Sequence, residues 1–232
     1  MDKTRAEEFH SQGLQAREKG DFTGSLQQVS AARVAFQEEG NDAKFAETMA
    51  GDFLTYRHLF DKTGYKGYLV LAKCAALASV ELAELSGDKT ALAIPLFNLA
   101  KAQETLGQLT EAVETYRKAV TALETNPPAS HNRPAVKADF KIHLTTGEYM
   151  AGDKTAYARA ASATAELEAA EETDYNKHVW LSGAQMRMAA MLKSNDPVKA
   201  REHLAKAKEI IDADEQLTIR RQQWEKLAKE IG

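Results

Sequence analysis

The amino-acid sequence predicts an all-α fold built from stacked helical hairpins. Glycine and proline number 13 and 5 in 232 residues, about 8% of the chain where roughly 12% is average. Ala, Leu, Glu, Lys and Gln, which favour helices, are common. A pattern of large, small and turn-forming residues also recurs along the chain. Few helix breakers and a recurring pattern together indicate long helices joined by short turns.

The clearest hairpin runs from Ile94 to Pro127 and is interrupted at Gly107. Ala112, Tyr116 and Ala119 follow the turn at spacings of four and three, so they share one helix face. Small residues on such a face let two helix axes approach to the lower end of the roughly 8 to 10 Å range. With Leu96, Leu99 and Ala100 before the turn, this segment resembles a tetratricopeptide repeat (TPR), a pair of antiparallel helices.

The same pattern of residues recurs in other parts of the chain. The small residue near the start of the second helix of a hairpin falls at Ser25, Ala112, Ala156 and Ala200. The interval between Ser25 and Ala112 contains a further helix, turn and helix. The spacing gives a period near 44 residues, and the resemblance is to a long-helix TPR variant. We therefore expect one right-handed α-solenoid domain over residues 1–232. Its predicted elements are five hairpins, approximately 3–39, 42–86, 88–126, 133–172 and 174–212, and a C-terminal capping helix over 214–231.

Two proline positions and one cysteine carry further expectations. Pro95 predicts a kink or a late start in the first helix of the third hairpin. The segment from Thr125 to Pro134, which contains three prolines, predicts a break between the first three hairpins and the last two. Cys74 lies among Leu71, Ala75, Ala76 and Leu77, and this apolar context predicts a buried, inert thiol.

Composition excludes several classes of function. The formal net charge of −4 lacks the basic excess that nucleic-acid phosphates attract. The longest apolar run near the middle, Tyr68 to Ala72, is too short to span a membrane. A single cysteine cannot form an internal disulfide or a cysteine-based zinc site, which favours a reducing, cytoplasmic location. No zinc, phosphate-loop or nucleophile-elbow motif is present, so we expect no catalytic residues, metal or cofactor.

The expected binding surface is the concave groove that, in TPR arrays, the first helices of the hairpins line. The resemblance assigns to it a mixed set of cationic, amide and apolar side chains: His10, Arg17, Leu54, His58, Phe97, Asn98, Lys101, Lys141 and Gln185. Such a lining suits an extended peptide, because cationic and amide groups hold its carboxylates and backbone. Asn98 could equally brace neighbouring hairpins. It matches the central Asn of the carboxylate clamp in chaperone-binding TPR domains, but the flanking positions do not follow that clamp.

The sequence therefore predicts a non-catalytic protein interaction scaffold that binds a protein or peptide segment in its groove. Two alternatives stay open. One is a self-assembling structural module, which would form a homo-oligomer, and the other is a sensor of a small peptide signal.

Overall fold

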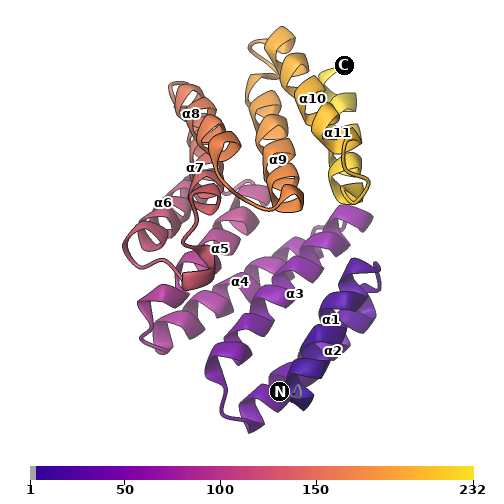
Figure 1. Ribbon diagram of the computed structural model, residues 1–232, viewed down its shortest axis with the longest axis vertical. Coiled ribbons are helices and arrows are strands. Elements are labelled where there is room, and N and C mark those ends of the chain that lie inside the picture. Colours follow the sequence, from indigo (N-terminus) through magenta and orange to yellow (C-terminus); the bar gives the residue numbers. More distant parts are fainter. Residues whose placement is uncertain (1–3) are drawn as a thin grey trace. The chain divides into compact units, whose positions relative to one another are not determined.

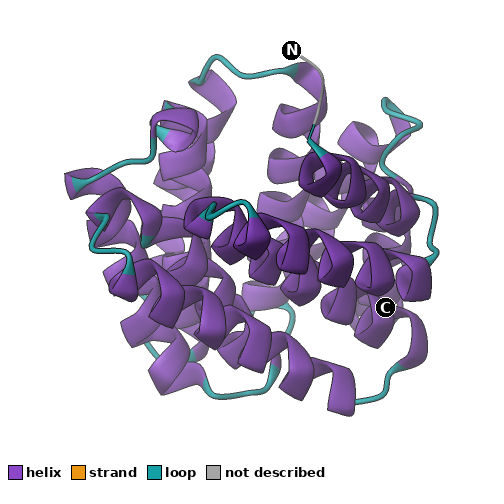
Figure 2. Cartoon of the chain, turned by 90° about the horizontal axis from the view of Figure 1, so that it is seen from below, coloured by secondary structure: helices purple, strands orange, loops and turns teal. Residues whose placement is uncertain are grey.

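The structure is a computed structural model that describes residues 4–232 (Figure 1). The described residues form eleven α-helices and two short 3-10 helices, with no strand among them (Figure 2). The chain divides into two compact units, Met1–Asn126 and Pro127–Gly232. This boundary lies inside the segment from Thr125 to Pro134, where the sequence predicts a break.

Unit 1 holds three helical hairpins. Their helices are α1 (Arg5–Glu18) with α2 (Phe22–Glu38), α3 (Asp42–Thr63) with α4 (Gly67–Leu85), and α5 (Ala93–Thr105) with α6 (Leu109–Thr125). Each second helix also packs against the first helix of the next hairpin, α2 on α3 and α4 on α5. The first helices contact one another in turn, α1 with α3 and α3 with α5. This is the layered arrangement of a helical repeat.

Local chemistry explains the ends of these helices. Thr4 and Glu7 form a capping box at the start of α1, where the Thr4 hydroxyl accepts from the Glu7 backbone N–H and the Glu7 carboxylate accepts from the Thr4 N–H. Gly107, predicted as the turn residue of the third hairpin, has a φ of 79°, a left-handed conformation that glycine adopts without strain. Pro95 is the third residue of α5, whose start at Ala93 follows a short 3-10 helix (Lys89–Ala91). The predicted late start is therefore observed.

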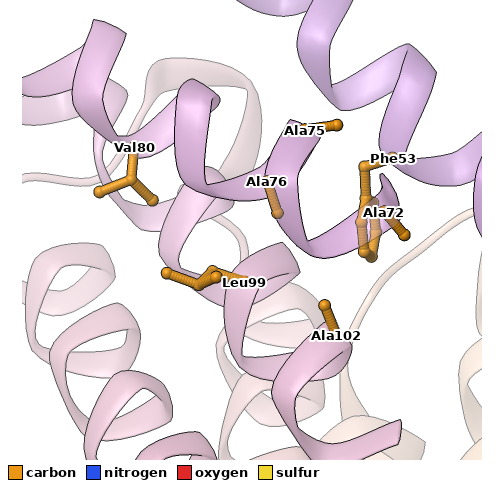
Figure 3. Packing of buried hydrophobic residues seen from close by; sticks show 7 residues of the cluster. All are labelled: Phe53, Ala72, Ala75, Ala76, Val80, Leu99 and Ala102. Atoms are coloured by element: carbon orange, nitrogen blue, oxygen red, sulfur yellow. The ribbon is translucent and has the colours of Figure 1, made fainter. Parts of the chain in front are cut away.

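The centre of unit 1 is packed with small residues. Ala72, Ala75 and Ala76 of α4 meet Phe53 of α3, and the same buried cluster includes Val80, Leu99 and Ala102 (Figure 3). The alanines let the helices approach closely around the Phe53 ring. Phe53, Leu69, Ala72 and Val80 are all buried.

Unit 2 holds two hairpins and a final helix. Its helices are α7 (Pro134–Met150), α8 (Ala156–Ala169), α9 (Asp174–Leu192), α10 (Pro197–Asp212) and α11 (Thr218–Ile231). The α11 helix packs on α9 and α10, and the Trp224 indole donates a hydrogen bond of 2.8 Å to the Leu204 carbonyl. Arg221 binds Asp212 at 2.8 Å, which ties α11 to the end of α10. These contacts agree with a helix that covers the last hairpin.

Some details differ from the sequence prediction. The last helix begins at Thr218 rather than at 214, because Asp214 is the start of a turn that its side chain closes on the Gln216 N–H. Residue 3, the predicted start of the first hairpin, lies outside the described residues. The prediction for Cys74 is wrong, since its side chain is exposed. Leu69, Ala72, Ala76 and Val80 lie on the buried side of α4, and Cys74 lies on the opposite side.

Candidate functional site

Arg17 is the most unusual of the predicted groove residues. It lies in the last turn of α1, and only 11% of its side chain is exposed. Its Nη2 donates to the Glu18 carboxylate at 3.4 Å, a long contact to a side chain that is itself 67% exposed. Its Nη1 is buried and has no hydrogen-bond partner among residues 4–232. A buried donor without an acceptor costs about 1 to 3 kcal/mol, so this guanidinium keeps an unused N–H group that could donate to an oxygen atom.

His58 of α3 belongs to the same electrostatic neighbourhood. Its ring stacks on Phe22 with centroids 6.0 Å apart, and the Lys62 ammonium lies 5.5 Å from the Phe22 ring centroid. Burial lowers the pKa of His58 below its usual value, and the charges of Arg17 and Arg57 lower it further. The imidazole is therefore neutral at pH 7 and offers one donor and one acceptor.

His10 and Leu54 serve mainly as packing residues. His10 is buried, and its ring meets Phe36 edge-on at 6.0 Å. Burial is the main cause of its lowered pKa, and the Arg17 charge acts in the same direction. Leu54 is half-buried against the cluster around Phe53.

On α5, the predicted contact residues differ in how deeply they are buried. Phe97 is only 6% exposed and packs edge-on against Tyr116 at 5.7 Å, and Asn98 is also buried. The Lys101 ammonium lies 5.1 Å from the Phe97 ring centroid, and this side chain is half-buried. Glu104 accepts a hydrogen bond of 2.7 Å from the Tyr116 hydroxyl. Phe97 thus holds Lys101 by a cation–π contact rather than presenting an open apolar surface.

In unit 2, the predicted contact residues already have partners. Lys141 of α7 forms an ion pair of 3.1 Å with Glu166 of α8. Gln185 of α9 and Tyr157 of α8 both hydrogen-bond His203 of α10, at 2.7 and 2.9 Å. Each of these interactions joins two helices of the unit.

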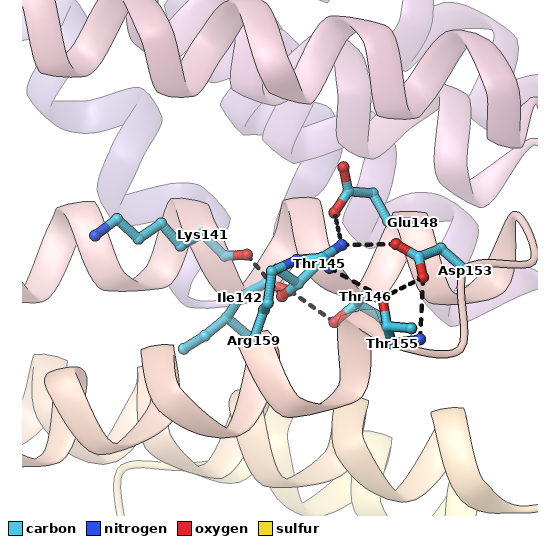
Figure 4. A network of polar contacts seen from close by, with 8 residues as sticks. All are labelled: Lys141, Ile142, Thr145, Thr146, Glu148, Asp153, Thr155 and Arg159. Carbon is cyan, nitrogen blue, oxygen red and sulfur yellow. Dashed lines mark hydrogen bonds and ion pairs between the residues drawn. The ribbon is translucent and has the colours of Figure 1, made fainter.

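A second polar network in unit 2 was not expected from the sequence. Arg159 of α8 binds Glu148 of α7 and Asp153 of the intervening turn, at 2.7 and 2.8 Å (Figure 4). Asp153 also accepts from Thr155, and these hydrogen bonds lower its pKa to about 2. The carboxylate stays charged through the ordinary pH range and closes the turn. No sequence motif marks such a network, because Arg159 and its partners are separated by six and eleven residues.

The described part of the chain shows no metal centre: residues 4–232 contain no group of three or more His, Cys, Asp or Glu side chains that could hold an ion. Among the same residues, no helix is long and apolar enough to cross a bilayer.

Comparisons with known proteins identify the architecture. No family model matches the sequence, and no curated protein matches it. The solved structures that resemble it include two different proteins, each at 14% identity. One is a putative kinesin light chain with nearly identical TPR-like repeats from Podosopora anserina, which has a TM-score of 0.55 and coverage of 89% of this chain and 94% of the other. The other is a Rap protein complexed with competence and sporulation factor, with a TM-score of 0.59 and coverage of 99% and 66%. The chain has a TPR-type fold.

A further solved structure shows a similar likeness. BtubC (BKLC) from P. vanneervenii is 18% identical, with a TM-score of 0.51 and coverage of 91% of this chain and 92% of the other. At such identities the likeness establishes the all-α helical-repeat fold and leaves the ligand to the chemistry of the surface.

Proposed function

We propose that the protein is a non-catalytic interaction scaffold that binds an acidic protein or peptide segment on the first helices of unit 1. The observation that carries this proposal is the Arg17 guanidinium, which has one buried N–H group unused and the other side held by an exposed, replaceable Glu18. A ligand carboxylate that displaces Glu18 would accept a charge-assisted hydrogen bond from Nη2, a pairing that arginine favours.

Neighbouring side chains extend this site along the first helices. His58 supplies a neutral donor and acceptor, and Lys101 supplies a second cation on α5. The net charge of −4 argues against nucleic acid as the ligand, and we place the protein in the cytoplasm. In unit 2, Lys141 and Gln185 stay candidate contacts that would have to exchange their present partners.

A peptide-display selection on the immobilised full chain tests this function. We expect the selected segments to be enriched in Asp and Glu, and R17Q to weaken the affinity of the best segment by ten- to a hundredfold. This factor corresponds to the roughly 1.5 to 3 kcal/mol of a charge-assisted hydrogen bond. Fluorescence anisotropy with the labelled segment measures it.

R117Q is the matched control, because it removes one arginine charge from the exposed face of α6 in the same unit. It should change the affinity less than twofold. Equal affinities of R17Q and wild type, or selected segments with no acidic residues, would refute the proposed site.

A further inference from the structure

The α4 helix carries an exposed apolar face that its unit does not use. Val70, Leu71 and Leu77 are 53%, 44% and 42% exposed, and Cys74 is exposed between them. At 100° per residue these four side chains lie within about 120° of one another. Val70, Cys74 and Leu77 line a hollow of about 410 Å³ together with Lys73, and the turn before α6 contributes Leu106 and Gln108.

The other second helices of unit 1 do not share this feature. The exposed positions of α2 are mainly polar, with Val34 at 56% the exception, and those of α6 are Thr, Glu, Arg and Lys. The stacking of hairpins therefore does not require an apolar outer face. Since soluble proteins seldom expose a continuous apolar stripe without a use, the α4 face is an interaction surface.

We propose that this face binds the same face of a second copy of the chain, with the two α4 helices antiparallel across a twofold axis near Cys74. In such an isologous contact, a residue n positions before Cys74 meets the residue n positions after it. Val70 of each copy then faces the partner's Ala78 and Leu77, so apolar groups meet apolar groups along the centre.

The charges at the two ends of α4 are complementary in this arrangement. Glu81 lies seven residues after Cys74, about 10.5 Å along the axis, and Lys66 lies eight residues before it, about 12 Å along the axis. Antiparallel pairing brings each Glu81 to the Lys66 of the partner. Both side chains are exposed, and neither forms an ion pair within residues 4–232. Parallel pairing would instead place like charges together, so the charge pattern selects a second copy in the antiparallel orientation.

The twofold axis also fixes the distance between the two thiols. Helices that pack about 8 to 10 Å apart, with Cα atoms at a radius of about 2.3 Å, bring facing Cα atoms to roughly 3.5 to 5.5 Å. This range overlaps that of a disulfide, about 4.4 to 6.8 Å between Cα atoms. Cys74, the only cysteine of the chain, is therefore a built-in reporter of the contact.

Sedimentation equilibrium of the full chain over a concentration series tests the dimer. The expected mass rises from 25.5 kDa towards twice that value, with half-association at micromolar concentration because one helix face makes a small interface. L77E should hold the mass at that of the monomer, and V34E, at an even more exposed apolar position on α2, should leave the dimer unchanged. A wild-type mass of one chain at every concentration, or equal effects of L77E and V34E, would overturn the proposal.

Two further variants test the axis and the orientation. Diamide removes one hydrogen from each of two thiols and leaves an S–S bond, so wild type should give a covalent dimer, and the single-cysteine variant C74S/V34C should cross-link at least tenfold more slowly. K66E should weaken the dimer, and K66E/E81K should restore it, because the exchange rebuilds both ion pairs. Equal cross-linking rates, or no restoration by the double variant, would contradict antiparallel pairing at Cys74.

Discussion

Two glycines on either side of Val29 give opposite predictions for the same substitution. Gly13 of α1 and Gly51 of α3 both face Val29 of α2. A Cβ at Gly13 would lie 2.7 Å from the Val29 Cγ2, 3.2 Å from the Val29 backbone N and 3.3 Å from the Ser25 carbonyl oxygen. A Cβ at Gly51 would meet the Val29 methyl groups at 3.6 and 3.7 Å, which is ordinary van der Waals contact.

The distances set the sign of each effect. Alanine in a helix is favoured over glycine by about 1 kcal/mol, so G51A should stabilise unit 1 by roughly that amount. At Gly13 the clash involves backbone atoms and a β-branched side chain whose rotamer is fixed in a helix. Overpacking of this kind costs about 1 to 3 kcal/mol, and the net effect of G13A is a loss of about 1 kcal/mol. For a unit of this size, each kcal/mol changes the melting temperature by roughly 4 °C.

Circular dichroism at 222 nm measures these shifts in the full chain. Both tryptophans, Trp180 and Trp224, lie in unit 2, so tryptophan fluorescence follows that unit and serves as an internal reference. We expect the dichroism transition of unit 1 to fall by about 4 °C in G13A and to rise by about 4 °C in G51A. A G13A protein as stable as G51A would refute the close approach of α1 and α2 at Val29.

Two further predictions concern an ion pair and the division of the chain. Arg33 donates to Thr48 and to the buried Asp52, whose pKa burial raises and Arg33 lowers; R33M should therefore cost about 3 kcal/mol at pH 7. Because the folded pKa of Asp52 then lies further above its unfolded value, protonation favours the folded state. The free energy of unfolding of R33M should therefore be higher at pH 5 than at pH 7.5. Thermal melts of R33M and wild type at both pH values measure this. If the melting temperature of R33M relative to wild type does not rise at pH 5, the prediction is wrong. Residues 1–126 should fold alone, since they form a compact unit, and a disordered fragment by circular dichroism would show that unit 1 depends on the rest.

Much of the fold could be predicted from residue spacing. The turn glycine Gly107, the small residues Ala112 and Ala119 and the buried Tyr116 all occupy the places that the repeat pattern assigns them. These positions are predictable because they depend on local constraints, a left-handed turn and a close approach of two axes. The start of α11 was not, because the turn after Asp214 depends on one side-chain hydrogen bond.

The candidate site was less predictable than the fold. The repeat pattern indicates that Phe97 and Lys101 share the first-helix surface, but it does not give their depth, and Phe97 is a packing residue under Lys101. Lys141 forms an ion pair with Glu166 on the neighbouring helix, 25 residues away in the chain. Such pairings depend on the crossing angle and the rotation of each helix, which periodicity leaves open.

The exposed thiol of Cys74 shows where sequence reasoning fails for a physical reason. Cys74 lies among apolar residues in the sequence, and such residues are most often buried; this context predicted an inert cysteine. The α4 helix, however, packs on α3, on α5 and on the short 3-10 helix (Lys89–Ala91), and the side that carries Cys74 is exposed. The α2 and α6 helices occupy equivalent places with mainly polar outer faces. Packing within the described residues does not account for this departure of α4 from its two counterparts, whereas the proposed contact between two copies would.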